Sequence, residues 1–238
     1  MESLLTLPIG DYRAVELSLR LTMLLIVMTA LLQILCLSVV ERRFRLPLTL
    51  SSVALLGAGL FESGVWLAWK EAFELAGTSY CVTGHLLAGE DRIIAWSLGA
   101  PALLICFGLL QLNPREKVFR NLCWMALGWA ILGPFYQTMA LIGFVLCGVQ
   151  LRGILPSSSK KQESLRTETI IAIASMALGF TVTELGYLHL LPLGKTAEET
   201  LIRGEVIRSL CDLVTLVVPG VALLIGILRI SGENSKGA

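Results

Sequence analysis

Residues 121–151 read NLCWMALGWAILGPFYQTMALIGFVLCGVQL, an uncharged apolar run that contains Gly133-Pro134 near its middle. As one helix this run would be about 46 Å long, at about 1.5 Å per residue. A hydrocarbon core of about 30 Å is too thin for such a helix to cross upright. Because Pro134 lacks a backbone donor and Gly133 admits a turn, the run predicts two short helices, 116–133 and 134–153, joined as a hairpin.

Five further apolar runs are long enough to cross a membrane, which takes about 20 residues as a helix. The chain of 238 residues is 55% hydrophobic and 16% charged, with a mean hydropathy of +0.76, whereas a soluble domain is about 45–50% apolar and about 25% charged. The sequence therefore predicts an all-α integral membrane protein with seven transmembrane helices in a single domain over 1–238. The helices are expected at about 14–40, 46–69, 91–113, 116–133, 134–153, 167–193 and 204–229, with the fourth and fifth forming the short hairpin.

Basic residues predict the orientation of these helices. Most Lys and Arg residues fall in the segments 42–45, 115–120, 152–166 and 229–236, whereas the other helix ends carry more Asp and Glu. Cytoplasmic loops are enriched in Lys and Arg. We therefore expect the amino terminus outside and the carboxyl terminus in the cytoplasm, which requires both arms of the hairpin to cross. The alternative is a re-entrant pair that stops short.

Charge balance and motifs exclude several classes of function. The 19 basic residues nearly cancel the 18 acidic ones, which argues against a nucleic-acid surface. Cys81 and His85 alone do not make a metal site, so no bound metal is expected. The chain also lacks a phosphate-binding glycine loop or a Ser/His pairing on facing helices, so we expect no enzyme. The expected partners are the lipid bilayer and other membrane proteins.

Ionisable residues inside the apolar runs form a predicted charged layer. Glu62, Glu184 and Asp212 lie at similar depth, about 10 Å below the outer surface. Arg208 is four residues before Asp212 and shares its helix face, and Arg92 starts the third helix at the same level. Charges at membrane depth are costly and often functional. The alternative is a structural layer of ion pairs that holds the helices in register.

Two short patterns carry a family resemblance. The third helix reads Arg92-x-x-x-Trp96-x-x-x-x-Pro101, and the last reads Asp212-x-x-x-Leu216. With seven helices and a short fourth-fifth hairpin, the chain resembles the microbial rhodopsins. The resemblance implies that Arg92, Trp96 and Pro101 line the extracellular half and the retinal pocket, and that Asp212 belongs to a counter-ion complex.

The chain departs from this family at the positions that carry its photochemistry. Leu216 stands where the resemblance implies the lysine that binds retinal as a Schiff base. Ala95 and Cys106 stand where pumps of the family carry a proton acceptor and a proton donor. We therefore expect no covalent cofactor, and the light-driven pumping mechanism is not carried over.

The sixth helix offers a partial match to the aromatic face of the family. It reads Phe180-x-x-Thr183-Glu184-x-x-Tyr187, with two aromatic positions kept and a carboxylate in place of a proline. Phe180, Tyr187 and Trp96 would line a pocket for a non-covalent isoprenoid or carotenoid-type ligand, with Glu184 and Asp212 at its polar end.

The sequence thus supports two hypotheses about function. The first is a rhodopsin-like membrane protein without covalent retinal that acts as a sensor, accessory subunit or assembly factor and is able to hold an apolar ligand. The second is a proton or cation transporter or channel that uses the carboxylates Glu62, Glu184 and Asp212, gated by Arg92.

Overall fold

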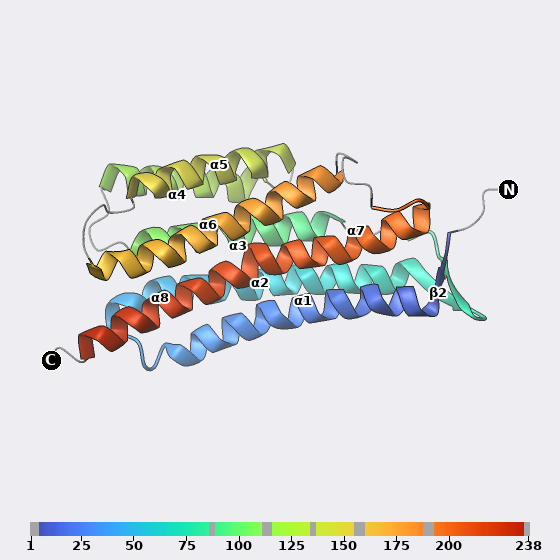
Figure 1. The fold of residues 1–238 in the computed structure, drawn as a ribbon, viewed down its shortest axis with the longest axis horizontal. Helices are drawn as coiled ribbons and strands as arrows, with labels where there is room; N and C mark the ends of the chain where they lie inside the picture. The colour runs from blue at the N-terminus through green and yellow to red at the C-terminus, as the bar shows by residue number, and fades with distance from the viewer. Residues whose placement is uncertain are drawn as a thin grey trace.

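A computed structural model of the chain describes residues 5–85, 89–110, 116–133, 137–154, 160–187 and 193–235. Helices and three short strands make up the elements (Figure 1). In chain order they are β1 (Thr6–Pro8), α1 (Ile9–Cys36), α2 (Arg42–Ala72), β2 (Phe73–Ala76), β3 (Ser79–Val82), α3 (Gly89–Leu110), α4 (Glu116–Leu132), α5 (Gln137–Ile154), α6 (Lys160–Tyr187), α7 (Ala197–Asp212), the π-helical turn η1 (Leu213–Val217) and α8 (Val218–Ser235).

The last three of these elements form one continuous helix. Asp212, Leu213 and Val218, which stand at the two junctions, all keep right-handed helical dihedrals. The π-helical turn η1 is wider than an α-helical turn but does not interrupt this continuous helix, which we count as one helical rod. Counted this way, the described residues form seven helical rods, which confirms the predicted fold class.

Helix boundaries follow local signals. α4 ends at Leu132, where the Gly133 amide donates to the Trp129 carbonyl at 2.7 Å, and α5 begins at Gln137. Pro134, to which the predicted break was assigned, lies outside the described residues. The last rod begins at Ala197, before the predicted residue 204, because the Thr196 hydroxyl accepts from the Glu199 amide at 3.1 Å and caps the helix.

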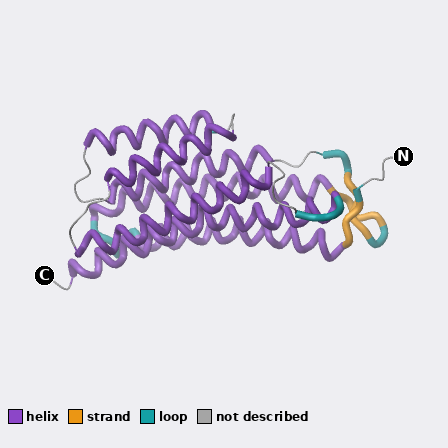
Figure 2. Tube along the Cα trace, turned by 45° about the horizontal axis from the view of Figure 1, so that its top comes forward, coloured by secondary structure: helices purple, strands orange, loops and turns teal. Residues whose placement is uncertain are grey.

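The rods run side by side along the long axis of the molecule (Figure 1). α1 packs on α2, α2 on α3, α4 on α5, and α6 on α8. One apolar core extends through these contacts and is built from fully buried side chains such as Leu55, Leu103, Phe107 and Leu223. The strands lie beyond the helices at the end that also carries the amino terminus (Figure 2). We call this end the sheet end and the opposite one the C-terminal end.

The sheet was not predicted from the sequence, which gave 70–92 as a polar connection. β3 lies between β1 and β2 and pairs antiparallel with both, with Leu7 opposite Tyr80. Gly77 makes the turn between β2 and β3 with a φ of 66°, a conformation that glycine adopts without a steric cost. Tyr12 stacks on Tyr80 with ring centroids 3.7 Å apart, so the sheet closes over an aromatic cluster.

The outer faces of the rods are apolar. Trp124 is 67% exposed and Leu35 is 70% exposed, which in water would be unfavourable over so long a surface. Four helices of the described chain are long and apolar enough to span a membrane, namely α1, α2, Glu90–Leu110 and Ala197–Gly232. The protein is therefore a multi-pass integral membrane protein whose exposed surface is solvated by lipid.

Candidate functional site

A buried network of charges joins α3 to α7 in the sheet-end half of the bundle. Arg92 is 3% exposed. Its Nε donates to Asp212 Oδ2 at 2.9 Å, and its Nη1 donates to Glu205 Oε2 at 3.2 Å. Arg208 in turn pairs with Glu205 through its Nη1. Hydrogen bonds between ionised groups of this kind are about twice as strong as neutral ones, so the network fixes the relative position of the two helices.

Sequence reasoning missed Glu205, which has a central place in this network. Glu205 accepts from two guanidinium groups and is 5% exposed. It precedes Asp212 by two helical turns, so both carboxylates lie on the same face of α7. That spacing was visible in the sequence. Residue 205 was instead counted among the acidic residues of the outer end segment 195–208, because it precedes the apolar run 209–228 by which the last helix was recognised.

Trp96 connects the charged network to an aromatic cluster. Its Nε1 donates to Asp212 Oδ1 at 2.8 Å, so Asp212 accepts from Trp96 on one oxygen and from Arg92 on the other. The ring of Trp96 packs edge-on against Phe180 with centroids 4.7 Å apart. Phe180 also contacts Trp129 and Phe144, at 5.4 and 5.2 Å between centroids. Rings from four helices therefore meet directly beneath the ion pairs.

Glu62 lies buried on α2 without a direct partner. It is 1% exposed, and neither carboxylate oxygen has a hydrogen-bond partner among the residues that the structure describes. In the same part of the chain, Nη2 of Arg92 also lacks one. Glu62 and the network thus occupy one layer without sharing a hydrogen bond.

The core between the charged network and the C-terminal end is mostly apolar. Ala95 and Leu216 are fully buried, and Leu216 Cδ2 lies only 2.5 Å from where a Cβ on Gly99 would stand. The Cys106 thiol donates to the Pro47 carbonyl at 3.1 Å. An ion pair between Arg229 and Glu168, at 2.6 Å, then joins α8 to α6.

The structure places the other predicted site residues as follows. Pro101 lies buried within α3. Glu184 and Tyr187 belong to α6, but their side chains lie outside the described part of the molecule. Their predicted roles at the polar end and wall of a pocket therefore stay predictions.

Comparison with known proteins finds neither a matching family model nor a matching curated sequence. Solved structures do match over almost the whole chain. Xanthorhodopsin, a light-driven ion pump with a dual chromophore, has a TM-score of 0.76 and 18% identity over 98% of this chain and 99% of that one. A thermophilic rhodopsin has a TM-score of 0.74 and 21% identity over 97% and 99%. A blue light-absorbing proteorhodopsin from Med12 has a TM-score of 0.55 and 16% identity over 90% and 98%.

These matches show the fold of the protein. The chain is a seven-helix membrane protein with a buried ion-pair network. Its fold is that of the microbial rhodopsins, as the resemblance implied. Its solved neighbours are rhodopsins and ion pumps rather than classical enzymes.

The comparisons contradict the cofactor prediction. One similar structure carries a dual chromophore and another absorbs blue light. A fold shared with light-absorbing rhodopsins favours retinal, the chromophore that the resemblance implies. The prediction of no covalent cofactor, with an isoprenoid or carotenoid-type ligand in its place, is therefore wrong. It failed because it gave one position, residue 216, more weight than the fold as a whole.

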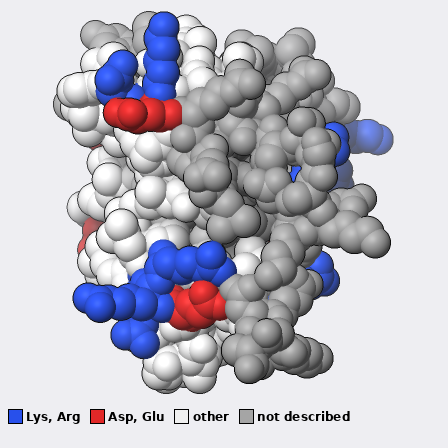
Figure 3. Space-filling model, turned by 90° about the vertical axis from the view of Figure 1, so that its left-hand side faces the viewer, with Lys and Arg blue, Asp and Glu red and all other residues white. Residues whose placement is uncertain are grey.

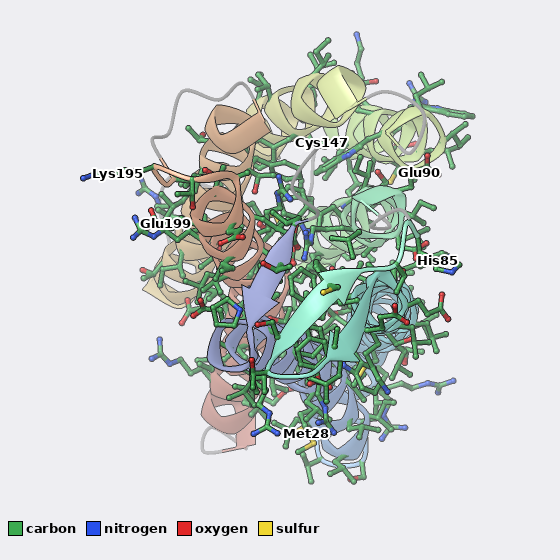
Figure 4. The ribbon with its side chains drawn as sticks, turned by 90° about the vertical axis from the view of Figure 1, so that its right-hand side faces the viewer. Met28, His85, Glu90, Cys147, Lys195 and Glu199 are labelled. Carbon is green, nitrogen blue, oxygen red and sulfur yellow. The ribbon has the colours of Figure 1, made fainter. Side chains whose placement is uncertain are left out.

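The residues around position 216 bear on how such a chromophore would be held. Leu216 has no amine, so this position does not fit a Schiff base. Lys195 precedes α7 at the sheet end, and its exposed side chain points away from the bundle (Figure 4). Trp96 and Phe180 are buried and pack against each other, and their predicted role as the wall of a ligand pocket stays a prediction.

Proposed function

We propose that the chain is a member of the microbial rhodopsin family that acts through contacts, as a sensor, accessory subunit or assembly factor, and does not pump ions. The observation that carries this proposal is the buried network around Arg92. Arg92 is held by two buried carboxylates of α7, and Trp96 fixes Asp212 from the other side. Separating Arg92 from these carboxylates would leave buried charges unpaired at a cost of about 3–5 kcal/mol, so the network opposes a rearrangement that moves an ion past it.

The other half of the core also supports a role without ion pumping. A proton relay needs ionisable groups at intervals along the pathway. The two positions that the resemblance assigns to proton transfer are Ala95 and Cys106, and Cys106 makes a hydrogen bond to a backbone carbonyl. Leu103, Phe107 and Leu223 are buried in the same apolar core as Ala95 and Cys106.

We further propose that the sheet end faces the outside and the C-terminal end the cytoplasm. Figure 3 looks onto the C-terminal end, where Lys and Arg side chains of the described residues gather around smaller patches of Asp and Glu. The positive-inside rule places such an end in the cytoplasm. A partner protein that binds the basic segments would then meet this chain in the cytoplasm. A partner that binds the acidic helix ends would meet it on the outside.

Reconstitution tests this function. The purified chain is placed in liposomes with and without added retinal, and internal pH is followed in the dark and under illumination. We expect no directed proton flux in any condition, together with co-purification of a second membrane polypeptide from the native membrane. A flux that Asp212→Asn abolishes would overturn the proposal.

Residue 216 is proposed as the counterpart of the lysine of the family. The test is Leu216→Lys incubated with retinal, followed by borohydride reduction and peptide mapping. We expect the trapped retinal on residue 216, because the side chain there is fully buried beside Gly99. Retinal trapped at another residue would show that this register is wrong.

A proton or cation transporter is the second candidate. Glu62 favours it, because a buried carboxyl without a direct partner is available to bind a transported ion. The liposome experiment separates the two candidates. A flux driven by a pH or sodium gradient and lost in Glu62→Gln would support transport.

A further inference from the structure

The position of Glu62 has a consequence for its charge, whichever function the protein has. Its carboxyl group is almost completely buried on α2, and both oxygens lack a hydrogen-bond partner within the described chain. An ionised carboxylate removed from water and left unpaired is strongly destabilising, whereas a neutral carboxyl group costs much less to bury.

The groups that face Glu62 do not offset this cost. They are Asp91 and Arg92 from α3, and Glu205 and Asp212 from α7. Three of these four are carboxyl groups, and the guanidinium of Arg92 already donates to Glu205 and Asp212. α1 also packs along α2. Its residue Thr22 carries no charge, and the Thr22 hydroxyl donates to the Ser209 carbonyl of α7.

Arg208 adds the second positive charge near this layer, and it pairs with Glu205. With Glu62 ionised, the layer would hold four carboxylates against two guanidinium groups. Like charges in a medium of low dielectric constant repel strongly. Uptake of one proton by Glu62 removes its uncompensated charge and leaves the ion pairs of Arg92 unchanged.

We propose that Glu62 is a proton-binding site that is occupied at neutral pH, so that the resting protein stores a proton within the membrane beside Arg92. Release of this proton to water leaves a carboxylate on Glu62. That carboxylate then competes with Glu205 and Asp212 for the guanidinium of Arg92, whose Nη2 has no partner among the described residues. Proton release at Glu62 is thereby coupled to the α3–α7 contact.

Infrared spectroscopy of the full chain in lipid nanodiscs tests this proposal. At pH 7 in potassium buffer, we expect the wild type to show the C=O stretching band of a buried protonated carboxyl group. Glu62→Gln should lose this band. Glu74→Gln is the matched control, because Glu74 is exposed on β2 at the same end, and it should keep the band.

Three results would overturn the proposal. The first is the absence of the band in the wild type, and the second is its persistence in Glu62→Gln. The third is loss of the band when sodium replaces potassium, which would make a cation the ligand of Glu62. Because Gln is nearly isosteric with a neutral Glu, Glu62→Gln should also unfold within a few degrees of the wild type, which checks that the variant is folded.

Discussion

Arg92 and Asp212 lie in direct contact, with Nε 2.9 Å from Oδ2, although 120 residues separate them in the chain. Arg92 stands near the start of α3, and Asp212 is the last residue of α7 before the π turn η1. Both are almost completely removed from solvent. The contact therefore links the two helices at the point where the geometry of the last rod changes.

Loss of the guanidinium should strongly destabilise the fold. In Arg92→Gln, Asp212 and Glu205 stay buried without their shared partner, and breaking a buried ion pair costs about 3–5 kcal/mol. Thermal unfolding in detergent measures this loss. Arg43→Gln is the control, because Arg43 pairs with Glu41 at an exposed site where a pair contributes about 0–1 kcal/mol. Equal losses in the two variants would show that the buried network does not stabilise the protein.

The indole donor of Trp96 should have a smaller, separable effect. Trp96→Phe keeps an aromatic ring against Phe180 but removes the hydrogen bond to Asp212 Oδ1. Hydrogen bonds to charged groups contribute about 1.5–3 kcal/mol, so the variant should lose that much free energy of unfolding. Trp124→Phe, at a site that is 67% exposed to lipid, should lose much less. A Trp96→Phe variant as stable as the wild type would contradict this account.

The fold and the site differ in how much of them the sequence could predict. Helix length and apolar composition identify the rods, because a membrane span needs about 20 apolar residues whatever it packs against. The sheet escaped prediction because its strands have three or four residues each, and because the whole of α1 and α2 lies between β1 and β3 in the sequence. Its one local signal was Gly77.

The sequence could predict individual residues of the site but not which of them pair with one another. Arg92, Trp96 and Asp212 follow a known pattern, and the structure joins them by hydrogen bonds. Which carboxylate pairs with which arginine depends on the start of α7 and on helix packing, and neither can be obtained from spacing alone. Glu205 was missed for that reason.

α6 packs closely on the π turn η1 at Gly179, so we expect a larger residue at this position to lower the stability of the protein. A Cβ on Gly179 would stand 2.1 Å from Thr215 Oγ1 and 3.0 Å from the Cys211 carbonyl. Gly179→Ala should therefore shift α6 and destabilise the protein by about 1–3 kcal/mol. Gly57→Ala is the matched control on α2, because its Cβ would meet nothing within 4 Å. That variant should be neutral or up to about 1 kcal/mol more stable. The opposite order of stability would contradict the described contact between α6 and η1.

The proposed orientation can be checked on the intact membrane through Cys81. Cys81 lies partly exposed on β3 at the sheet end, so a membrane-impermeant maleimide added from outside should label the wild type. Cys81→Ser should lose this labelling. Ser38→Cys in the Cys81→Ser background introduces an exposed thiol in the α1–α2 connection, at the C-terminal end, and should react only after the membrane is permeabilised. Labelling of residue 38 in sealed cells of that variant, with no labelling of Cys81 in sealed wild-type cells, would show the opposite orientation. Because the basic segments occupy the end that carries residue 38, that result would also make this protein an exception to the positive-inside rule.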